Sequence, residues 1–465
     1  MLPALVTALA LAGTPPAAPP PELEEGVAAL KAKNAALAAE KLQACVEKQP
    51  ANVACHWELG WAFYLSGDWE RVVAEWSEVK RLDPSHAEVD KRLEEARGQL
   101  ALRRKLDEAA AQAPTVRPAV RPEVSIRLRA VGDMMLGTTF PEGYLPPDDG
   151  AKLLDDVKDW LADADLTFAN FEGPLCDTDE PSDKCRGSKP GSCYAFKSPT
   201  RYAKYFVEAG IDVGSTANNH NGDFGEACRR STEKTLDAAG IKWSGAPGTI
   251  ASLERNGLKI GFVAFHTSNA TNDVNDLATA VKLVKVAKAQ HDLVIVSFHG
   301  GAEGAKATHV PHGKELFYGE NRGDLRRFTH GVIDAGADLV IGHGPHVLRG
   351  MEIYKGHLVA YSLGNFATYG RFNLSGPTAV GCVLEVVLGG DGKFVSGKIL
   401  PTKQIGEGVP VKDPDGTAIR YVRMLSEEDF PKTGVLVDAE GNIGPREDAQ
   451  PGGTIVKAKG TAPGH

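Results

Sequence analysis

The chain of 465 residues lacks the long apolar runs and the basic character that are typical of membrane-spanning and nucleic-acid-binding proteins. No stretch of about 20 apolar residues follows the N-terminal segment, so we expect no internal transmembrane helix. The 52 lysine and arginine residues are outnumbered by 61 aspartate and glutamate residues, which gives a net charge of −9. Because affinity for phosphate backbones needs a basic surface, we predict no nucleic-acid partner.

The seven cysteines contain no Cys-x-x-Cys motif, so zinc ribbons and thioredoxin-like redox sites have no support. Cys45 and Cys55 flank a predicted helix–helix turn, and Cys382 lies in an apolar strand, where we expect a buried thiol. The remaining four are Cys176, Cys185, Cys193 and Cys228. In an exported protein, a Cys45–Cys55 bridge and one or two bridges among these four are expected, although the sequence does not assign their pairing.

The N-terminus resembles a secretory signal peptide over residues 1–20. An apolar segment of about ten residues is followed by a small, Pro-rich stretch, as in exported proteins. No lysine or arginine precedes the apolar segment, and the alternative is a disordered apolar terminus. No cysteine follows it, so a lipid anchor is not supported. We therefore predict export to the periplasm, the cell envelope or the medium. Association of the exported protein with the envelope is one of these alternatives.

Residues 22–110 have helical periodicity. Trp57, Leu59, Gly60 and Tyr64 form the W-x-L-G-x-x-x-Y face of a tetratricopeptide-like repeat, one position off the commonest spacing. A degenerate copy precedes it and a capping helix follows. Such arrays bind extended peptides or partner proteins, so we predict a protein partner for this region, although the aromatic cluster is by itself more typical of a helix–helix core.

A Pro- and Ala-rich segment at residues 111–123 is predicted to be a linker, and strands and helices then alternate. We expect one α/β domain over residues 124–435 and a disordered tail at 446–465. Helices are expected at 151–164, 200–210, 226–240, 278–290 and 324–336. Asn256-Gly257 indicates the turn of a β-hairpin.

Five polar motifs follow apolar runs that are predicted to be buried strands: GDMML, NFEGP, NNHNGDFG, SFHGG and GHGPH. Open α/β sheets place their sites at the carboxyl ends of strands, so these motifs are expected to meet. Carboxylate, amide and imidazole groups are ligands for Mn, Zn or Fe, and we predict one or two divalent ions. The candidate ligands are Asp133, Glu172, Asn219, His299, His343 and His346.

Other polar residues of the motifs are candidates for catalysis or substrate binding. His220 is predicted to act as a general acid or to orient a substrate oxyanion, with Asp223 fixing its tautomer. A single histidine in such a position is more often a structural core group, and only the combination of Asp, Glu, Asn and His residues at separate strand ends favours a site. The candidate substrate-binding residues are Asn170, Asn218, His309 and His312.

At these motifs the chain resembles the CapA-type capsule and poly-γ-glutamate biosynthesis family, within the calcineurin-like metallophosphatase superfamily. The matching stretch runs from about Arg127 to Thr368, and its most specific part is GHGPHVLRGMEIYKGHLVAYSLGNF. The resemblance implies a four-layer α/β/β/α metallophosphatase-like sandwich. It also implies a one- or two-cation site built from the six candidate ligands, with His220 beside the scissile group.

The first motif departs from that of ordinary metallophosphatases, which have Asp-x-His where this chain has Asp133 and Met135. The Gly-Asp of their second motif is likewise replaced by Asn-Phe-Glu. A thioether is a poor ligand for hard divalent ions, so one metal position is short of a ligand.

Two functions follow as expectations. The first is an exported metal-dependent hydrolase of phosphoester or γ-glutamyl amide bonds in capsule, poly-γ-glutamate or envelope polymer metabolism, acting on an anionic polymer, peptide or phosphoester. The second is a non-catalytic, metal-containing scaffold subunit of a polymer synthesis or export complex. A nucleotidase is disfavoured, because the C-terminal region has Tyr421 and Phe430 but no obvious aromatic pair to clamp a base.

Overall fold

A computed structural model describes residues 19–111, 121, 123–185 and 193–446. The predicted signal peptide lies almost wholly outside these residues, as do most of the predicted linker and all but the first residue of the predicted tail. The chain divides after Gln112 into two compact units, which are described separately below.

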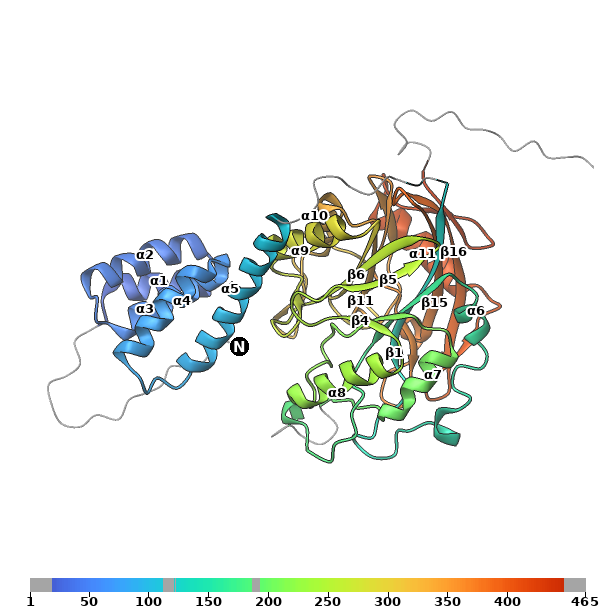
Figure 1. Ribbon diagram of the computed structural model, residues 1–465, viewed down its shortest axis with the longest axis horizontal. Helices are drawn as coiled ribbons and strands as arrows, with labels where there is room; N and C mark the ends of the chain where they lie inside the picture. Colours follow the sequence, from blue (N-terminus) through green and yellow to red (C-terminus); the bar gives the residue numbers. More distant parts are fainter. Residues whose placement is uncertain (1–18, 112–120, 122, 186–192, 447–465) are drawn as a thin grey trace, which may run out of the picture. The chain divides into compact units, whose positions relative to one another are not determined.

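The first unit is helical in its described part, as the sequence predicts (Figure 1). The side chains of Asn34, Asn52 and Asp68 cap three of the helices by accepting hydrogen bonds from backbone N–H groups of the first turn. The helices are α1 (Pro21–Lys31), α2 (Ala35–Lys48), α3 (Val53–Ser66), α4 (Trp69–Leu82) and α5 (Val89–Ala111). Their identity with tetratricopeptide repeats stays a prediction.

Aromatic side chains form the core of this unit. Trp76 of α4 is fully buried and donates from Nε1 to the Trp57 carbonyl oxygen at 3.2 Å. Trp61 and Tyr64 pack beside it, with ring centroids 5.2 and 6.0 Å from that of Trp76. Gly60 permits this packing, because a Cβ there would overlap the Trp76 indole. The aromatic residues of the repeat-like motif therefore build the interface between α3 and α4.

The second unit contains two large sheets. The ten-stranded sheet has the order β18-β19-β16-β15-β1-β2-β3-β4, with β14 beside β1 and β17 beside β16. Its strands are β1 (Ser125–Met135), β2 (Leu166–Phe171), β3 (Val213–Ser215), β4 (Lys242–Ser244), β14 (Asn365–Thr368), β15 (Val380–Gly389), β16 (Phe394–Ile405), β17 (Val409–Lys412), β18 (Leu436–Val437) and β19 (Asn442–Gly444). The sheet thus continues past residue 435, where the sequence placed the end of the domain.

The seven-stranded sheet has the order β12-β13-β11-β8-β6-β5, with β7 beside β6. Its central strands β6, β8 and β11 run parallel and are buried along almost their whole length, which explains their continuous apolar sequences. The strands are β5 (Ala251–Arg255), β6 (Leu258–His266), β7 (Asn272–Asp273), β8 (Leu293–His299), β11 (Leu339–His343), β12 (Met351–Tyr354) and β13 (His357–Ala360). A separate pair consists of β9 (Leu316–Phe317) and β10 (Glu320–Asn321).

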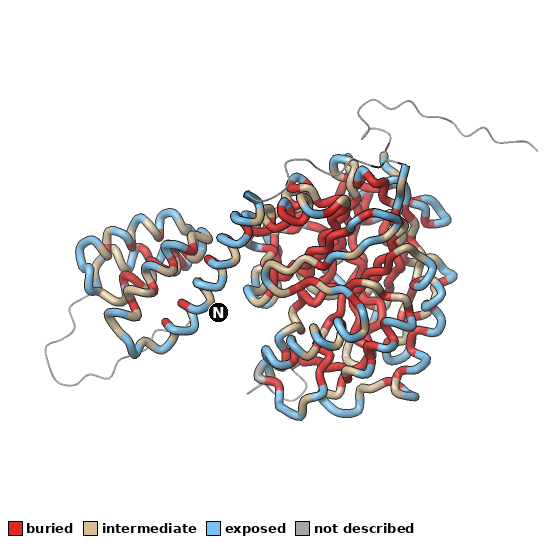
Figure 2. The backbone as a smooth tube through the Cα atoms, viewed as in Figure 1, coloured by how far each residue is buried: buried red, intermediate tan, exposed pale blue. Residues whose placement is uncertain are grey.

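The two sheets pack face to face, and the main core consists of side chains from both of them. Buried residues gather in the interior of this unit (Figure 2). Phe168 of β2 stacks on Phe262 of β6 across this core, with 5.8 Å between ring centroids. Helices cover the outer faces, so the predicted α/β/β/α sandwich is confirmed. The helices are α6 (Lys158–Ala162), α7 (Ala203–Glu208) and α8 (Gly225–Ala238) on the first sheet, α9 (Leu277–Gln290) and α10 (Leu325–Ala335) on the second, and α11 (Thr417–Asp429) against β16 and β12.

The local predictions differ from the structure mainly at residues 151–164. Only α6 is helical there, and residues 151–157 form turns. The carboxylate of Asp156 in this segment accepts a hydrogen bond from the backbone N–H of Lys412 at 2.7 Å. The hairpin between β5 and β6 turns at Asn256-Gly257, as predicted, and both residues have positive φ.

Three disulfides join Cys45 to Cys55, Cys176 to Cys228, and Cys185 to Cys193. Cys382 is a buried free thiol, and burial raises its pKa to about 12. The structure therefore decides the pairing that the sequence left open.

Within the described ranges, none of the helices has the length and hydropathy needed to cross a membrane.

The disulfides predict a simple thiol count. The folded protein should not react with a thiol reagent such as DTNB, because Cys382 is buried and its thiolate is disfavoured. Unfolding in guanidinium without reductant should expose one thiol per chain, and reduction should raise the count to all seven cysteines. More than one thiol in the unfolded, unreduced protein would contradict this pairing.

The packing of Gly60 predicts the effect of a single methyl group. Gly60→Ala should destabilise the helical unit by about 1–3 kcal/mol, because the Cβ displaces the Trp76 indole. Gly98→Ala in α5 is the matched control: its Cβ has open space, and alanine should stabilise the helix by about 0.5–1 kcal/mol. Urea unfolding followed by tryptophan fluorescence measures both, and equal effects would contradict the packing argument.

Candidate metal centre

Asp133 lies near the carboxyl end of β1, between two asparagines on the neighbouring parallel strands. Its register partners are Asn170 on β2 and Asn365 on β14. Asn170 Nδ2 donates to Asp133 Oδ1 at 2.8 Å, and the backbone N–H of Asp133 donates to the Gly364 carbonyl oxygen at 2.9 Å. A Cβ at Gly132 would overlap that carbonyl, so the glycine before Asp133 lets the two backbones approach.

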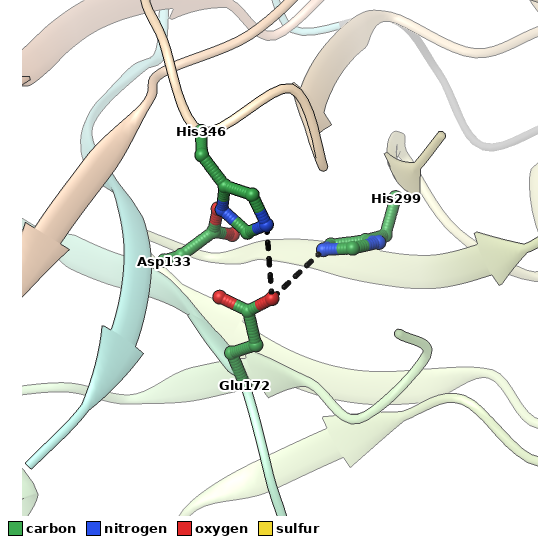
Figure 3. A group of neighbouring side chains, drawn as sticks. All are labelled: Asp133, Glu172, His299 and His346. Carbon is green, nitrogen blue, oxygen red and sulfur yellow. Dashed lines mark hydrogen bonds and ion pairs between the residues drawn. The ribbon is translucent and has the colours of Figure 1, made fainter. Parts of the chain in front are cut away.

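Glu172 follows β2 and is buried, and neither of its carboxylate oxygens has a hydrogen-bond partner among the described residues. Three imidazoles face Oε1: His299 Nε2 at 3.4 Å, His346 Nε2 at 3.5 Å and His220 Nε2 at 4.0 Å. Figure 3 shows Glu172 pointing between His299 and His346. Burial raises the pKa of Glu172 well above its usual range, and the nearby Asp133 carboxylate adds to the effect.

His299 and His343 end the adjacent parallel strands β8 and β11 in the same register. Neither ring nitrogen of His299 has a hydrogen-bond partner in the described structure. His343 donates from Nε2 to the Val131 carbonyl oxygen at 3.0 Å, which leaves a lone pair on its buried Nδ1. Burial lowers the pKa of both rings, so both are held in the neutral form that binds metals.

His346 lies in the turn after β11 with a positive φ of 59°. Its Nδ1 is 3.0 Å from both Asp133 Oδ2 and Asn365 Oδ1, so the N–H is directed at these oxygens and Nε2 is turned toward Glu172. Burial alone would lower the pKa of His346, but the Glu172 and Asp133 carboxylates outweigh burial and raise the pKa to about 10. A cation bound at Nε2 would replace that proton.

His220 borders the cluster on the loop after β3. Its Nδ1 is 2.7 Å from Asp223 Oδ2, the contact that the sequence predicts for fixing its tautomer. Lys184 Nζ lies 2.6 Å from the other oxygen of Asp223 and 3.3 Å from His220 Nδ1. Burial is the main cause that lowers the pKa of His220, and Lys184 adds to it, so the ring is neutral with Nε2 free.

The donor set fits a divalent cation. Ligand atoms of Asp133, Glu172, His299 and His346 all lie within 4.8 Å of one another. The buried atoms that lack hydrogen-bond partners include donors of four predicted ligands, namely Glu172, His299, His343 Nδ1 and Asn219 Oδ1. Buried polar atoms without partners are costly, and an ion held among them removes that cost. The mixture of carboxylate, amide and imidazole donors suits Mn, Zn or Fe.

The other predicted site residues occupy different positions. Asn170 and Asn218 are buried. Asn170 donates to the Asp133 side chain, and Asn218 Nδ2 donates to the Phe171 carbonyl oxygen at 2.7 Å, so both hold parts of the motifs in place. His309 is exposed, and its Nδ1 is 2.9 Å from Asp429 Oδ1 at the end of α11. His312 is exposed. Within the described residues, neither His309 nor His312 has an ion pair with the cluster, so their substrate contact stays a prediction.

Sequence reasoning missed three polar residues that the fold brings to this place. Asn365 is the first residue of β14, so the rule that polar site residues follow the end of a strand does not point to it. Lys184 and Glu303 lie on connections that no pattern of apolar residues points to. Glu303 Oε2 is 3.8 Å from His346 Nε2.

Comparison with known proteins gives one family and several relatives. The model of the bacterial capsule synthesis protein PGA_cap matches residues 127–369, just over half of the chain. The capsule biosynthesis protein CapA of Bacillus anthracis is 26% identical over 268 residues, which cover 53% of this chain and 60% of that protein. The PGA biosynthesis protein CapA of Bacillus subtilis (strain 168) is 27% identical over 260 residues, which cover 51% and 61%.

The alignments therefore span about three fifths of the length of these two relatives. Among solved structures, a 5′-nucleotidase precursor from Thermus thermophilus aligns with a TM-score of 0.33 and 14% identity, over 66% of this chain and 60% of that chain.

The donor set predicts that the purified protein retains Mn, Zn or Fe. His299→Ala should abolish retention, because it removes a donor that has no other partner. Removing the ion with a chelator should lower the unfolding free energy of the second unit by about 3 kcal/mol, if the free ion is at a hundred times its Kd. Elemental analysis and thermal unfolding measure these effects. His312→Ala is the matched control, and equal metal content in wild type and His299→Ala would contradict the assignment.

Proposed function

The chain belongs to the bacterial capsule synthesis protein PGA_cap family, and on this basis we propose that it is an exported, metal-dependent hydrolase that acts on an anionic capsule or envelope polymer. The scissile bond is a phosphoester or a γ-glutamyl amide. The observation that carries the proposal is the buried group of unpaired donors around Glu172, with the His220–Asp223 pair facing it at 4.0 Å.

His220 is the proton carrier of the proposed reaction. It is neutral, its Nδ1–H donates to Asp223, and its Nε2 is turned toward the cluster. In the reaction, water oxygen bonds to phosphorus or to the carbonyl carbon, and Nε2 accepts the proton of the water. The bond to the leaving oxygen or nitrogen breaks, and Nε2 returns the proton to it. Asp223 stabilises the charged ring between these events.

A divalent cation at this site supplies Lewis-acid chemistry, which polarises the oxygen of the scissile group and makes water a better nucleophile at neutral pH. The residues that would hold it are Asp133, Glu172 and Asn219 through oxygen, and His299, His343 and His346 through nitrogen. The proposal is supported by the mutual approach of ligand atoms of Asp133, Glu172, His299 and His346, and by the buried atoms of His343 and Asn219 that lack hydrogen-bond partners among the described residues.

Export is supported by the three disulfides, since such bonds form and persist in oxidising compartments. The predicted signal peptide points the same way. In this proposal the helical unit binds a protein partner of the polymer machinery.

A non-catalytic scaffold is the second candidate, and Met135 is the observation that favours it. The side chain is buried at the end of β1, and in the sequence it stands where ordinary metallophosphatases have the histidine of Asp-x-His, a stronger ligand than a thioether. Under this alternative the cation stabilises a binding surface for the polymer or its partners, and no bond is broken.

A metal-loaded assay separates the two candidates. Wild-type protein should hydrolyse bis-p-nitrophenyl phosphate or a γ-glutamyl peptide, and His220→Asn should lower kcat by about 10²–10⁴-fold, because the proton carrier is lost. Metal content should stay at the wild-type level. Glu320→Gln, which alters an exposed carboxylate on β10, is the control with an unchanged rate. No turnover of either substrate by the metal-loaded protein would reject the hydrolase and leave the scaffold.

A further inference from the structure

Glu303 is a carboxylate near the cluster that no motif of the sequence singled out. It lies in the connection after β8, four positions beyond His299, and its side chain is mostly buried, with 18% exposed. Its Oε2 is 3.8 Å from His346 Nε2, the same nitrogen that lies 3.5 Å from Glu172 Oε1. Two carboxylates thus approach one imidazole nitrogen from two different connections.

The connection is fixed in place around Glu303. Arg322 accepts the Gly301 N–H through its backbone oxygen at 2.7 Å and donates from Nε to the Gly301 carbonyl oxygen at 3.0 Å. The backbone N–H of Ala302 donates to Glu315 Oε2 at 2.9 Å. The Gly304 N–H donates to the Pro345 carbonyl oxygen at 3.0 Å, directly beside His346. Hydrogen bonds of the residues before and after Glu303 therefore fix the backbone on both sides of it.

A buried ion pair between Arg349 and Glu315 also holds this connection in place. Arg349 donates from Nη1 and Nη2 to the two oxygens of Glu315 at 2.8 and 2.7 Å, and from Nε to the Ala307 carbonyl oxygen at 2.8 Å. Both side chains are almost fully buried. A buried, bidentate ion pair of this kind fixes the geometry of the groups it joins. Glu303 therefore lies on a rigidly held connection, as a ligand residue requires.

Arg322 also sets the direction of the Glu303 carboxylate. Its Nη2 lies 2.9 Å from Glu303 Oε1, an ion pair whose angle falls short of a hydrogen bond. With Oε1 facing the guanidinium, Oε2 is the oxygen presented to His346. A ligand carboxylate held by a second, charged group is the usual arrangement around metal centres.

The distances of the two carboxylates from His346 are those of ligands on one ion. Donor atoms that are each about 2.0–2.2 Å from a common ion lie about 3–4 Å apart. The distances from His346 Nε2 to Glu172 Oε1 and to Glu303 Oε2 are 3.5 and 3.8 Å, and both fall in this range. Glu303 is not part of the group of four whose ligand atoms all lie within 4.8 Å of one another, so it borders the cluster on the His346 side.

We propose that Glu303 is a further oxygen ligand of the cation, held in place by Arg322, and that it supplies the donor that Met135 does not. This assignment rests on the proposed function only in needing the cation, not in needing hydrolysis. The ion would then be shared by Glu172, His346 and Glu303, which joins the ends of both sheets through a single centre.

The test is the affinity for Mn²⁺, measured in the full chain by the electron paramagnetic resonance signal of free Mn²⁺. Glu303→Gln should weaken binding about 10- to 100-fold, because an oxygen donor and a charge are lost. Glu303→Asp keeps the charge but is one methylene too short, and it should weaken binding as well. Glu320→Gln, which alters an exposed carboxylate on β10, is the matched control with unchanged affinity.

Two outcomes would overturn the proposal: Glu303→Gln with wild-type affinity, or Glu303→Asp with wild-type affinity, since the latter means that charge alone suffices. Circular dichroism of the metal-free variants establishes that they are folded. The proposed function can fail separately from this inference. If wild-type protein binds Mn²⁺ through Glu303 but turns over neither substrate, the inference stands and the hydrolase is rejected.

Discussion

The burial of carboxylates without hydrogen-bond partners is the constraint on which the rest of this structure depends. Glu172 is closed off from solvent with neither oxygen paired among the described residues, and Asp133 lies beside it. Charges in such a place need a cation or a proton, and here His346 carries the proton, with a pKa of about 10. The protein therefore contains a position that is prepared for a cation. Without the cation, the proton on His346 supplies the positive charge at this position.

Two sheets supply this position because their parallel strands end at the same edge of the sandwich. β1 and β2 of the first sheet carry Asp133 and Glu172, while β8 and β11 of the second carry His299 and His343. The core between the sheets fixes their separation, with Phe168 stacked on Phe262 a short way below. The ligand geometry is consequently set by the same packing that stabilises the domain.

Cation binding and catalysis make different demands on these residues. A cation needs only the converging donors. Turnover needs, in addition, a proton carrier with a free nitrogen, and His220 has one because Asp223 engages the other. Lys184 forms an ion pair with Asp223, and the next residue, Cys185, is joined to Cys193 by a disulfide. A methionine at position 135 removes a ligand and so lowers the affinity for the cation. In our proposal Glu303 supplies the missing oxygen donor, and the role of His220 is unchanged.

The sequence alone determined the alternation of elements and the polar residues at strand ends, because apolar runs indicate buried strands and parallel strands share an edge. The four-layer sandwich was predicted from the family resemblance of the motifs. Asp133, Glu172, His299 and His346 were predicted on that ground, and the structure brings them together. Only the tertiary structure decided the disulfide pairing, the inward turn of Asn170 and Asn218, and the approach of Asn365, Lys184 and Glu303. These depend on how connections cross the sheet ends, which is set by distant packing such as the Arg349–Glu315 pair.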